Sequence, residues 1–147
     1  MNRAIIIGGS IAGLLTARVL SKHFDQVIIL ERDRLTEDGQ SRSGVPQDRH
    51  GHLLMSKGQQ IMEQLLPDMK KEFEQANLPQ IQWGLDTRIL MSGGWMKHSD
   101  LGITTYACSR IWLETCIRKL VTRIPNIETI DHAKVQSLRT DEDKQKI

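Results

Sequence analysis

The stretch AIIIGGSIAGLLTARVLSKHFDQVIILE, residues 4–31, decides the fold of this chain. It begins with a short apolar run at residues 4–7 and passes through a glycine turn into a helical segment at residues 13–22. A second apolar run, residues 27–30, ends at Glu31. Unbroken apolar runs of this length are typical of strands buried on both faces of a parallel sheet. The order of strand, glycine turn, helix, strand and acidic residue predicts a dinucleotide-binding βαβ unit.

The glycine turn has the residues that a diphosphate site needs. Gly8 permits a sharp turn out of the strand, because it can adopt backbone angles closed to other residues. Gly13 lets the helix pack closely on the sheet, and the free N–H groups of the helix N-terminus attract a diphosphate. Ser10 replaces the second glycine of the fingerprint, a departure from the strict motif, but it is small and its hydroxyl can donate to phosphate. The expected diphosphate-binding residues are Gly8, Gly9, Ser10, Ile11, Ala12 and Gly13.

Glu31 stands at the end of the second predicted strand, where a carboxylate accepts hydrogen bonds from an adenosine ribose. A carboxylate repels a 2′-phosphate, so FAD or NAD is favoured over NADP. The simpler interpretation is a Rossmann-like strand and helix whose glycines serve packing alone. The complete order of elements around the turn favours the dinucleotide site.

Composition limits the classes of protein to consider. A length of 147 residues suggests one domain, residues 1–147, and 39% hydrophobic residues suffice for a core. The net charge of +2 and the scattered basic residues do not indicate a nucleic-acid partner. No apolar run approaches the ~18 residues of a transmembrane segment, and the N-terminus lacks the features of a signal peptide. Two cysteines are too few for a disulfide framework, no metal site is expected, and a cytoplasmic location is the default.

A long polar loop at residues 36–52 follows the βαβ unit. Its Arg42, Arg49, His50 and His52 can bring positive charge and donors to a cofactor, and the alternative is a solvated connection. Ser109 is the expected N-cap of a helix with an apolar stripe. The other elements expected from periodicity and turn residues are helices at 53–66, 68–77 and 109–124, and strands at 85–91, 95–98, 104–108, 127–130 and 133–139.

Four segments taken in order carry a resemblance to a known family. They are IIIGGSIAGLLTARVL at residues 5–20, VIILERD at 27–33, RSGVPQDRHGHLL at 42–54 and SRIWLETCIRKL at 109–120. Together they resemble the N-terminal part of FAD-dependent monooxygenases related to para-hydroxybenzoate hydroxylase. The loop at residues 42–54 is similar to that of a bacterial branch described as epoxidases or hydroxylases.

The resemblance implies roles for individual residues. The glycine turn would hold the FAD diphosphate, Glu31 would bind the adenosine ribose, and Arg32 would lie beside the adenine. Arg42 matches a loop arginine that contacts the cofactor. Arg110 begins an Arg-x-x-Leu motif, completed by Leu113, that reaches the flavin chain. A cation in the first turn of a helix opposes the helix dipole, so the placement of Arg110 favours a functional role.

The resemblance also implies what is missing. Family members continue through an Asp-Gly motif, a Gly-Asp motif and a substrate domain, and none of these follows Arg110 here. The predicted fold is therefore an α/β, Rossmann-like FAD/NAD(P)-binding βαβ domain with a parallel sheet and a small β-sheet insertion, C-terminally incomplete. An incomplete sheet exposes an edge, through which the chain is expected to associate.

Three functions remain open. The first is the FAD-binding portion of a monooxygenase that uses NAD(P)H and dioxygen on a small organic substrate, inactive as this fragment. A flavin-dependent reductase of the same fold shares this N-terminus. The second is a non-catalytic NAD-binding Rossmann module, and the third is a remnant that binds nothing tightly. No residue of the chain is assigned a catalytic role.

Overall fold

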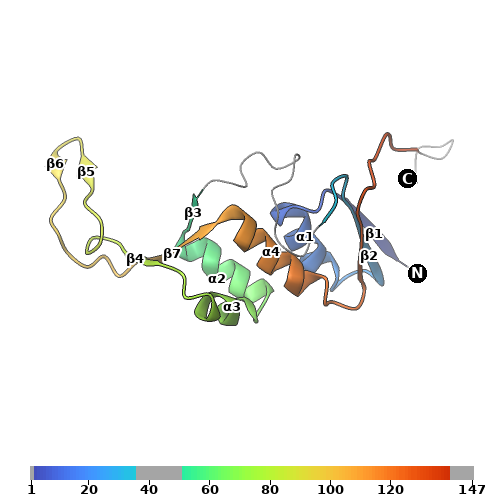
Figure 1. The fold of residues 1–147 in the computed structure, drawn as a ribbon, viewed down its shortest axis with the longest axis horizontal. Coiled ribbons are helices and arrows are strands. Elements are labelled where there is room, and N and C mark those ends of the chain that lie inside the picture. The colour runs from blue at the N-terminus through green and yellow to red at the C-terminus, as the bar shows by residue number, and fades with distance from the viewer. Residues whose placement is uncertain (1, 36–50, 140–147) are drawn as a thin grey trace.

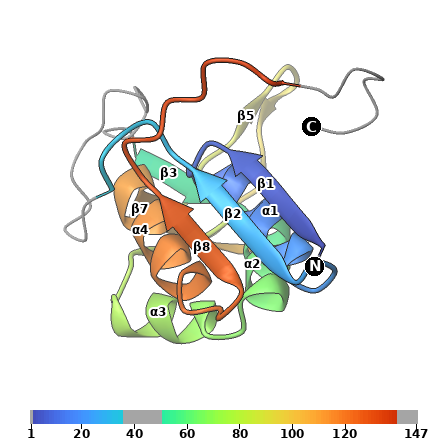
Figure 2. The same cartoon turned by 90° about the vertical axis from the view of Figure 1, so that its right-hand side faces the viewer.

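A computed structural model describes residues 2–35 and 51–139 of the chain. Its centre is a parallel sheet of three strands, β1 (Arg3–Ile7), β2 (Gln26–Leu30) and β8 (Ile127–Ile130), in the order β1-β2-β8. Helix α1 (Ile11–Leu20) connects β1 to β2, and helix α4 (Arg110–Val121) precedes β8. Figure 2 shows the sheet in front, with α1 and α4 behind it. The predicted α/β fold with its parallel βαβ unit is confirmed.

The sheet is covered on one face within the described residues. Ala4 and Ile6 of β1 are buried, and so are the alternate residues Val27 and Ile29 of β2, because they point towards the helices. Ile5 and Ile7 of β1 are 60% and 59% exposed. The expectation that the first strand is buried on both faces is therefore wrong here. β1 also forms one edge of the sheet.

A second, antiparallel sheet lies beyond the helices (Figure 1). It contains β3 (Gly51–Leu54), β7 (Thr104–Ser109) and β4 (Gln80–Gln82), in the order β3-β7-β4. Two further helices, α2 (Ser56–Leu65) and α3 (Met69–Gln75), lie between β3 and β4 in the chain. A small hairpin of β5 (Leu90–Met91) and β6 (Gly94–Trp95) extends away from the helices. These strands are the small β-sheet insertion that the sequence predicts.

One hydrophobic core joins the two sheets through the helices. Phe73 of α3 stacks on Tyr106 of β7 with ring centroids 5.1 Å apart, and its ring also lies against Trp112 of α4. The largest fully buried apolar side chains are Phe73, Leu14, Ile29, Met69, Ile117, Val27 and Val121. No helix in residues 2–35 and 51–139 has the length and apolar character that a membrane crossing needs.

Three local predictions differ from the structure. The helix expected at 53–66 begins at Ser56, because residues 51–54 pair with β7 as a strand. The strands expected at 85–91 and 95–98 shrink to the two-residue strands β5 and β6. Residues 133–139 form no strand and pair with no strand of the described sheets. The N–H of Ala133 donates to the carbonyl oxygen of Glu31 at 2.8 Å, at the end of β2.

Candidate functional site

The glycine turn lies at the carboxyl end of β1, where the chain enters α1. Gly8 has φ +105°, in the region that favours glycine, and its N–H donates to the carbonyl oxygen of Leu30 at 2.8 Å. A Cβ on Gly13 would lie 1.8 Å from the carbonyl oxygen of Gly8. Both positions therefore require glycine, one for its backbone angles and the other for the close approach of helix and turn.

The N-terminus of α1 opens onto this turn. Ser10 is the N-cap residue, but its side chain makes no capping hydrogen bond to the helix. Its hydroxyl instead donates to Glu114 Oε2 at 2.9 Å and accepts from Arg110 Nη2 at 2.9 Å. The N–H groups of the first turn, with the positive end of the helix dipole, thus remain suited to an anion. The proton of the Ser10 hydroxyl is directed to Glu114 in this structure, and its donation to a phosphate stays a prediction.

Glu31 is 6% exposed and holds the turn against the end of β2. Its Oε2 accepts from the N–H of Gly9 at 2.6 Å, and its Oε1 accepts from the N–H of Asp33 at 3.0 Å. A carboxylate oxygen is also the kind of acceptor that a ribose hydroxyl needs. The ribose role of Glu31 stays a prediction. Arg32, exposed beside it, lies 3.8 Å from the carboxylate of Asp33.

A buried ionic cluster joins α4 to the turn. Arg110 begins α4, and its Nη2 lies 3.6 Å from Glu114 Oε2. Glu114 is 4% exposed, and its Oε1 accepts from Arg118 Nη2 at 2.9 Å. Arg110 is predicted from the sequence, whereas Glu114 and Arg118 are not. Their signal is the spacing i, i+4, i+8 that starts at Arg110, which places all three on one face of a helix.

The electrostatics at this place fit a diphosphate. Two guanidinium groups face one carboxylate, and the N-terminus of α1 adds partial positive charge. Arg110 Nε is buried and has no hydrogen-bond partner among the described residues. A buried donor of this kind is costly unless something accepts from it. Arg110 reaches the turn through the hydrogen bond from its Nη2 to the hydroxyl of Ser10.

Four of the predicted site residues, Gly8, Ser10, Glu31 and Arg32, line one cavity. A volume of about 320 Å³ at the ends of β1 and β2 is lined by Ile7, Gly8, Ser10, Leu30, Glu31, Arg32, Ala133, Lys134 and Val135. Gly9 follows Gly8 in the glycine turn, and residues 11–13 form the first turn of α1. Arg110 contacts Ser10. The contribution of residues 133–135 was missed, because that segment was expected to be a strand. Arg42 lies outside the described residues, as do Arg49 and His50.

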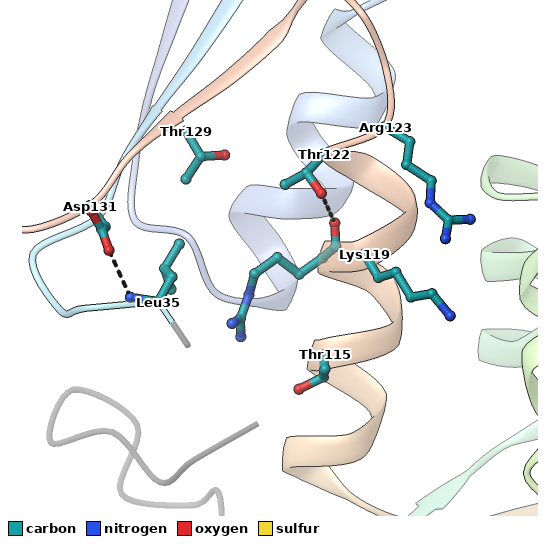
Figure 3. Close-up of a pocket in the computed structure, with 8 residues that line it drawn as sticks. Leu35, Thr115, Lys119, Thr122, Arg123, Thr129 and Asp131 are labelled. Atoms are coloured by element: carbon teal, nitrogen blue, oxygen red, sulfur yellow. Dashed lines mark hydrogen bonds between the residues drawn. The ribbon is translucent and has the colours of Figure 1, made fainter. Parts of the chain in front are cut away.

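A larger cavity of about 650 Å³ lies elsewhere, between α4, the end of β8 and Leu35 (Figure 3). Thr129 and Asp131 border it on one side, whereas the side chains of Lys119 and Arg123 point away from them. None of the predicted site residues lines it. The smaller cavity is the better candidate, because the fingerprint glycines, Glu31 and the N-terminus of α1 converge there.

The described residues give little support for a metal site or a reactive thiol. No three His, Cys, Asp or Glu side chains of residues 2–35 and 51–139 are grouped to hold a metal ion. Cys108 and Cys116 are buried free thiols. Burial raises the pKa of both, and the pKa of Cys116 reaches about 11 with a further contribution from the negative charge of Glu72. Both therefore stay protonated and unreactive at neutral pH. Trp83 donates to Thr105 Oγ1 at 3.1 Å on the antiparallel sheet.

Comparisons with known proteins agree with this geometry. No family model matches the chain. Protein Rv3254 of Mycobacterium tuberculosis is 35% identical over 133 residues, which cover 88% of this chain and 28% of that protein. The structure of PqsL, a probable FAD-dependent monooxygenase from Pseudomonas aeruginosa, matches with a TM-score of 0.64 at 13% identity, over 97% of this chain and 36% of PqsL.

A second enzyme structure gives the same result. In 2-methyl-3-hydroxypyridine-5-carboxylic acid oxygenase the match has a TM-score of 0.62 at 15% identity and covers 90% of this chain and 32% of that enzyme. The chain thus spans about a third of the length of the proteins that it matches. It has the fold of the N-terminal part of FAD-dependent monooxygenases.

Proposed function

We propose that this chain is the FAD-binding portion of an FAD-dependent monooxygenase, which takes NAD(P)H as reductant and a small organic substrate. One observation carries the proposal. The close approach at Gly13, the N-terminus of α1 and the buried Nε of Arg110 converge beside Ser10, at the carboxyl ends of β1 and β2. Ligands of open α/β sheets bind outside the carboxyl ends of the strands.

Different residues would bind different parts of FAD. The first-turn N–H groups of α1 would bind the diphosphate, Arg110 would reach the flavin chain, and Glu31 would bind the ribose. When bound, FAD supplies the redox and oxygen chemistry, whereas the protein supplies position and electrostatics. A reductase of the same fold, or an NAD-binding module, would use the same turn. Arg110 and the fold match favour FAD over NAD alone.

Titration of the purified chain with FAD, and separately with NAD, by isothermal calorimetry tests the proposal. We expect saturable FAD binding, about 10- to 100-fold weaker in Arg110→Ala, because a charged hydrogen bond contributes about 1.5–3 kcal/mol. Glu31→Ala should weaken both FAD binding and thermal stability, because Gly9 and Asp33 lose their acceptor.

Arg123→Ala is the matched control. Arg123 is an exposed arginine just beyond the end of α4, at the larger cavity, and its loss should leave the affinity for FAD unchanged. Binding of NAD without FAD would favour the Rossmann module instead. A chain that binds neither ligand would contradict the proposal.

A further inference from the structure

The serine at position 10 departs from the fingerprint in a place where a side chain matters. The second glycine of the motif allows the backbone to approach the pyrophosphate closely. Any side chain that points forward from this position occupies space that the ligand needs. A serine is therefore acceptable only if its side chain is held in another direction.

The structure shows what holds it. The hydroxyl of Ser10 donates to Glu114 Oε2 at 2.9 Å, across 104 positions of the sequence, so the side chain is tied towards α4. The other oxygen of Glu114 accepts from Arg118 Nη2 at 2.9 Å, which fixes the carboxylate. The hydroxyl also accepts from Arg110 Nη2. Both directions of hydrogen bonding by Ser10 are thus satisfied away from the first turn of α1.

The burial of Glu114 itself calls for a reason. A carboxylate that is 4% exposed loses its hydration, and beside a diphosphate site it also repels the ligand. Arg110 and Arg118 offset this, since they lie 3.6 Å and 2.9 Å from its two oxygens. If the only task were to hold α1 and α4 together, apolar side chains would do so without the desolvation cost of buried charges. The bond to Ser10 is the feature that apolar side chains cannot reproduce.

We propose that Glu114 is a positioning residue that holds the side chain of Ser10 away from the diphosphate, so that serine can stand where the fingerprint has its second glycine. Arg118 fixes Glu114 for this task. The proposal rests on the dinucleotide function proposed above and adds a requirement to it. Glu114 is needed because residue 10 is not glycine, and the need disappears if residue 10 becomes glycine.

Isothermal calorimetry with ADP, FAD and adenosine tests this requirement in four forms of the chain. These are the unchanged protein, Glu114→Gln, Ser10→Gly and the double variant. Ser10 and Arg118 donate to different oxygens of Glu114, and glutamine replaces one of these oxygens by an NH2 group, so one of the two donors loses its acceptor. We expect Glu114→Gln to bind ADP and FAD about tenfold more weakly and adenosine within about twofold of the unchanged protein. In the Ser10→Gly background the same substitution should have little effect.

Two further variants distinguish a specific loss of ADP binding from a general loss of folding. Ser10→Cys leaves Glu114 and both arginines in place but replaces the hydroxyl by a weak donor, so it should lose ADP affinity to a similar extent. Glu72→Gln is the matched control, because Glu72 also pairs with a cation of α4, Lys119 at 2.9 Å, and lies away from the turn. Its affinity for ADP should be unchanged.

The outcomes separate the two proposals. Glu114→Gln could weaken ADP binding equally in the unchanged protein and in Ser10→Gly, or weaken adenosine binding as much as ADP binding. Either result would mean that Glu114 only stabilises the fold, and would overturn its proposed role. Unchanged ADP binding in Glu114→Gln and Ser10→Cys would overturn it as well. Failure of the unchanged protein to bind ADP and FAD would instead refute the proposed function on which it rests.

Discussion

Substitution of Gly13 by alanine is the sharpest test of the turn geometry, because two known effects oppose each other there. Alanine is favoured over glycine inside a helix by about 1 kcal/mol. The new Cβ, however, would lie 1.8 Å from the carbonyl oxygen of Gly8. Roughly 1.6 Å of movement is needed to reach the 3.4 Å at which ordinary contact begins. Gly8 cannot retreat freely, since its N–H is bonded to Leu30.

The steric effect should exceed the gain in helix propensity. Overpacking typically costs about 1–3 kcal/mol, and more when the obstacle is backbone that cannot change rotamer. We expect Gly13→Ala to lower the free energy of unfolding by about 2 kcal/mol. For a chain of this length that lowers the melting temperature by about 4–8 °C. Affinity for FAD should fall too, because α1 must move away from the turn.

Circular dichroism during thermal unfolding measures the change in stability, and calorimetry measures FAD binding. Gly58→Ala is the control, since Gly58 is also helical but its added Cβ would meet only Leu54 Cδ1 at 3.6 Å. That variant should gain about 0.5–1 kcal/mol. If Gly13→Ala is as stable as the unchanged chain and binds FAD equally well, that result would contradict the close approach of Gly13 to the carbonyl oxygen of Gly8.

Two other predictions concern α4. Ser109→Ala removes the side-chain acceptor for the N–H of Trp112 at 3.1 Å and should cost about 1 kcal/mol in urea unfolding, whereas Ser109→Gly should cost only a few tenths. Burial, and then the charge of Glu72, raises the pKa of Cys116 from its ordinary 9.0 to about 11, so the folded chain binds the thiol proton more tightly than the unfolded chain does. The contribution of the Cys116 thiol to the free energy of unfolding should therefore be fully present below about pH 9 and be lost as the pH rises towards 11. Urea unfolding at both ends of that range should show a smaller fall in Cys116→Ala, and equal falls would contradict the prediction.

The sequence by itself determined the elements whose signals are local. The apolar runs ending at Ile7 and Leu30, with the glycines between them, predict the βαβ unit because strand burial, turn angles and helix periodicity depend on neighbouring residues. The position of Glu31 at the end of β2 and the N-cap role of Ser109 follow in the same way. These are also the features on which the resemblance to FAD-dependent monooxygenases depends.

The tertiary structure alone decided which distant residues meet. No local signal indicates that Ser10 bonds to Glu114, or that residues 133–135 cross the end of β2 to line the cavity with Glu31. Nor does the sequence show that residues 51–54 pair with β7 instead of beginning a helix. Such contacts depend on how helices and strands pack against one another, and packing is set by the whole core and not by neighbours along the chain. The glycine motif can therefore be recognised in the sequence, whereas the hydrogen bond between Ser10 and Glu114 is seen only in the fold.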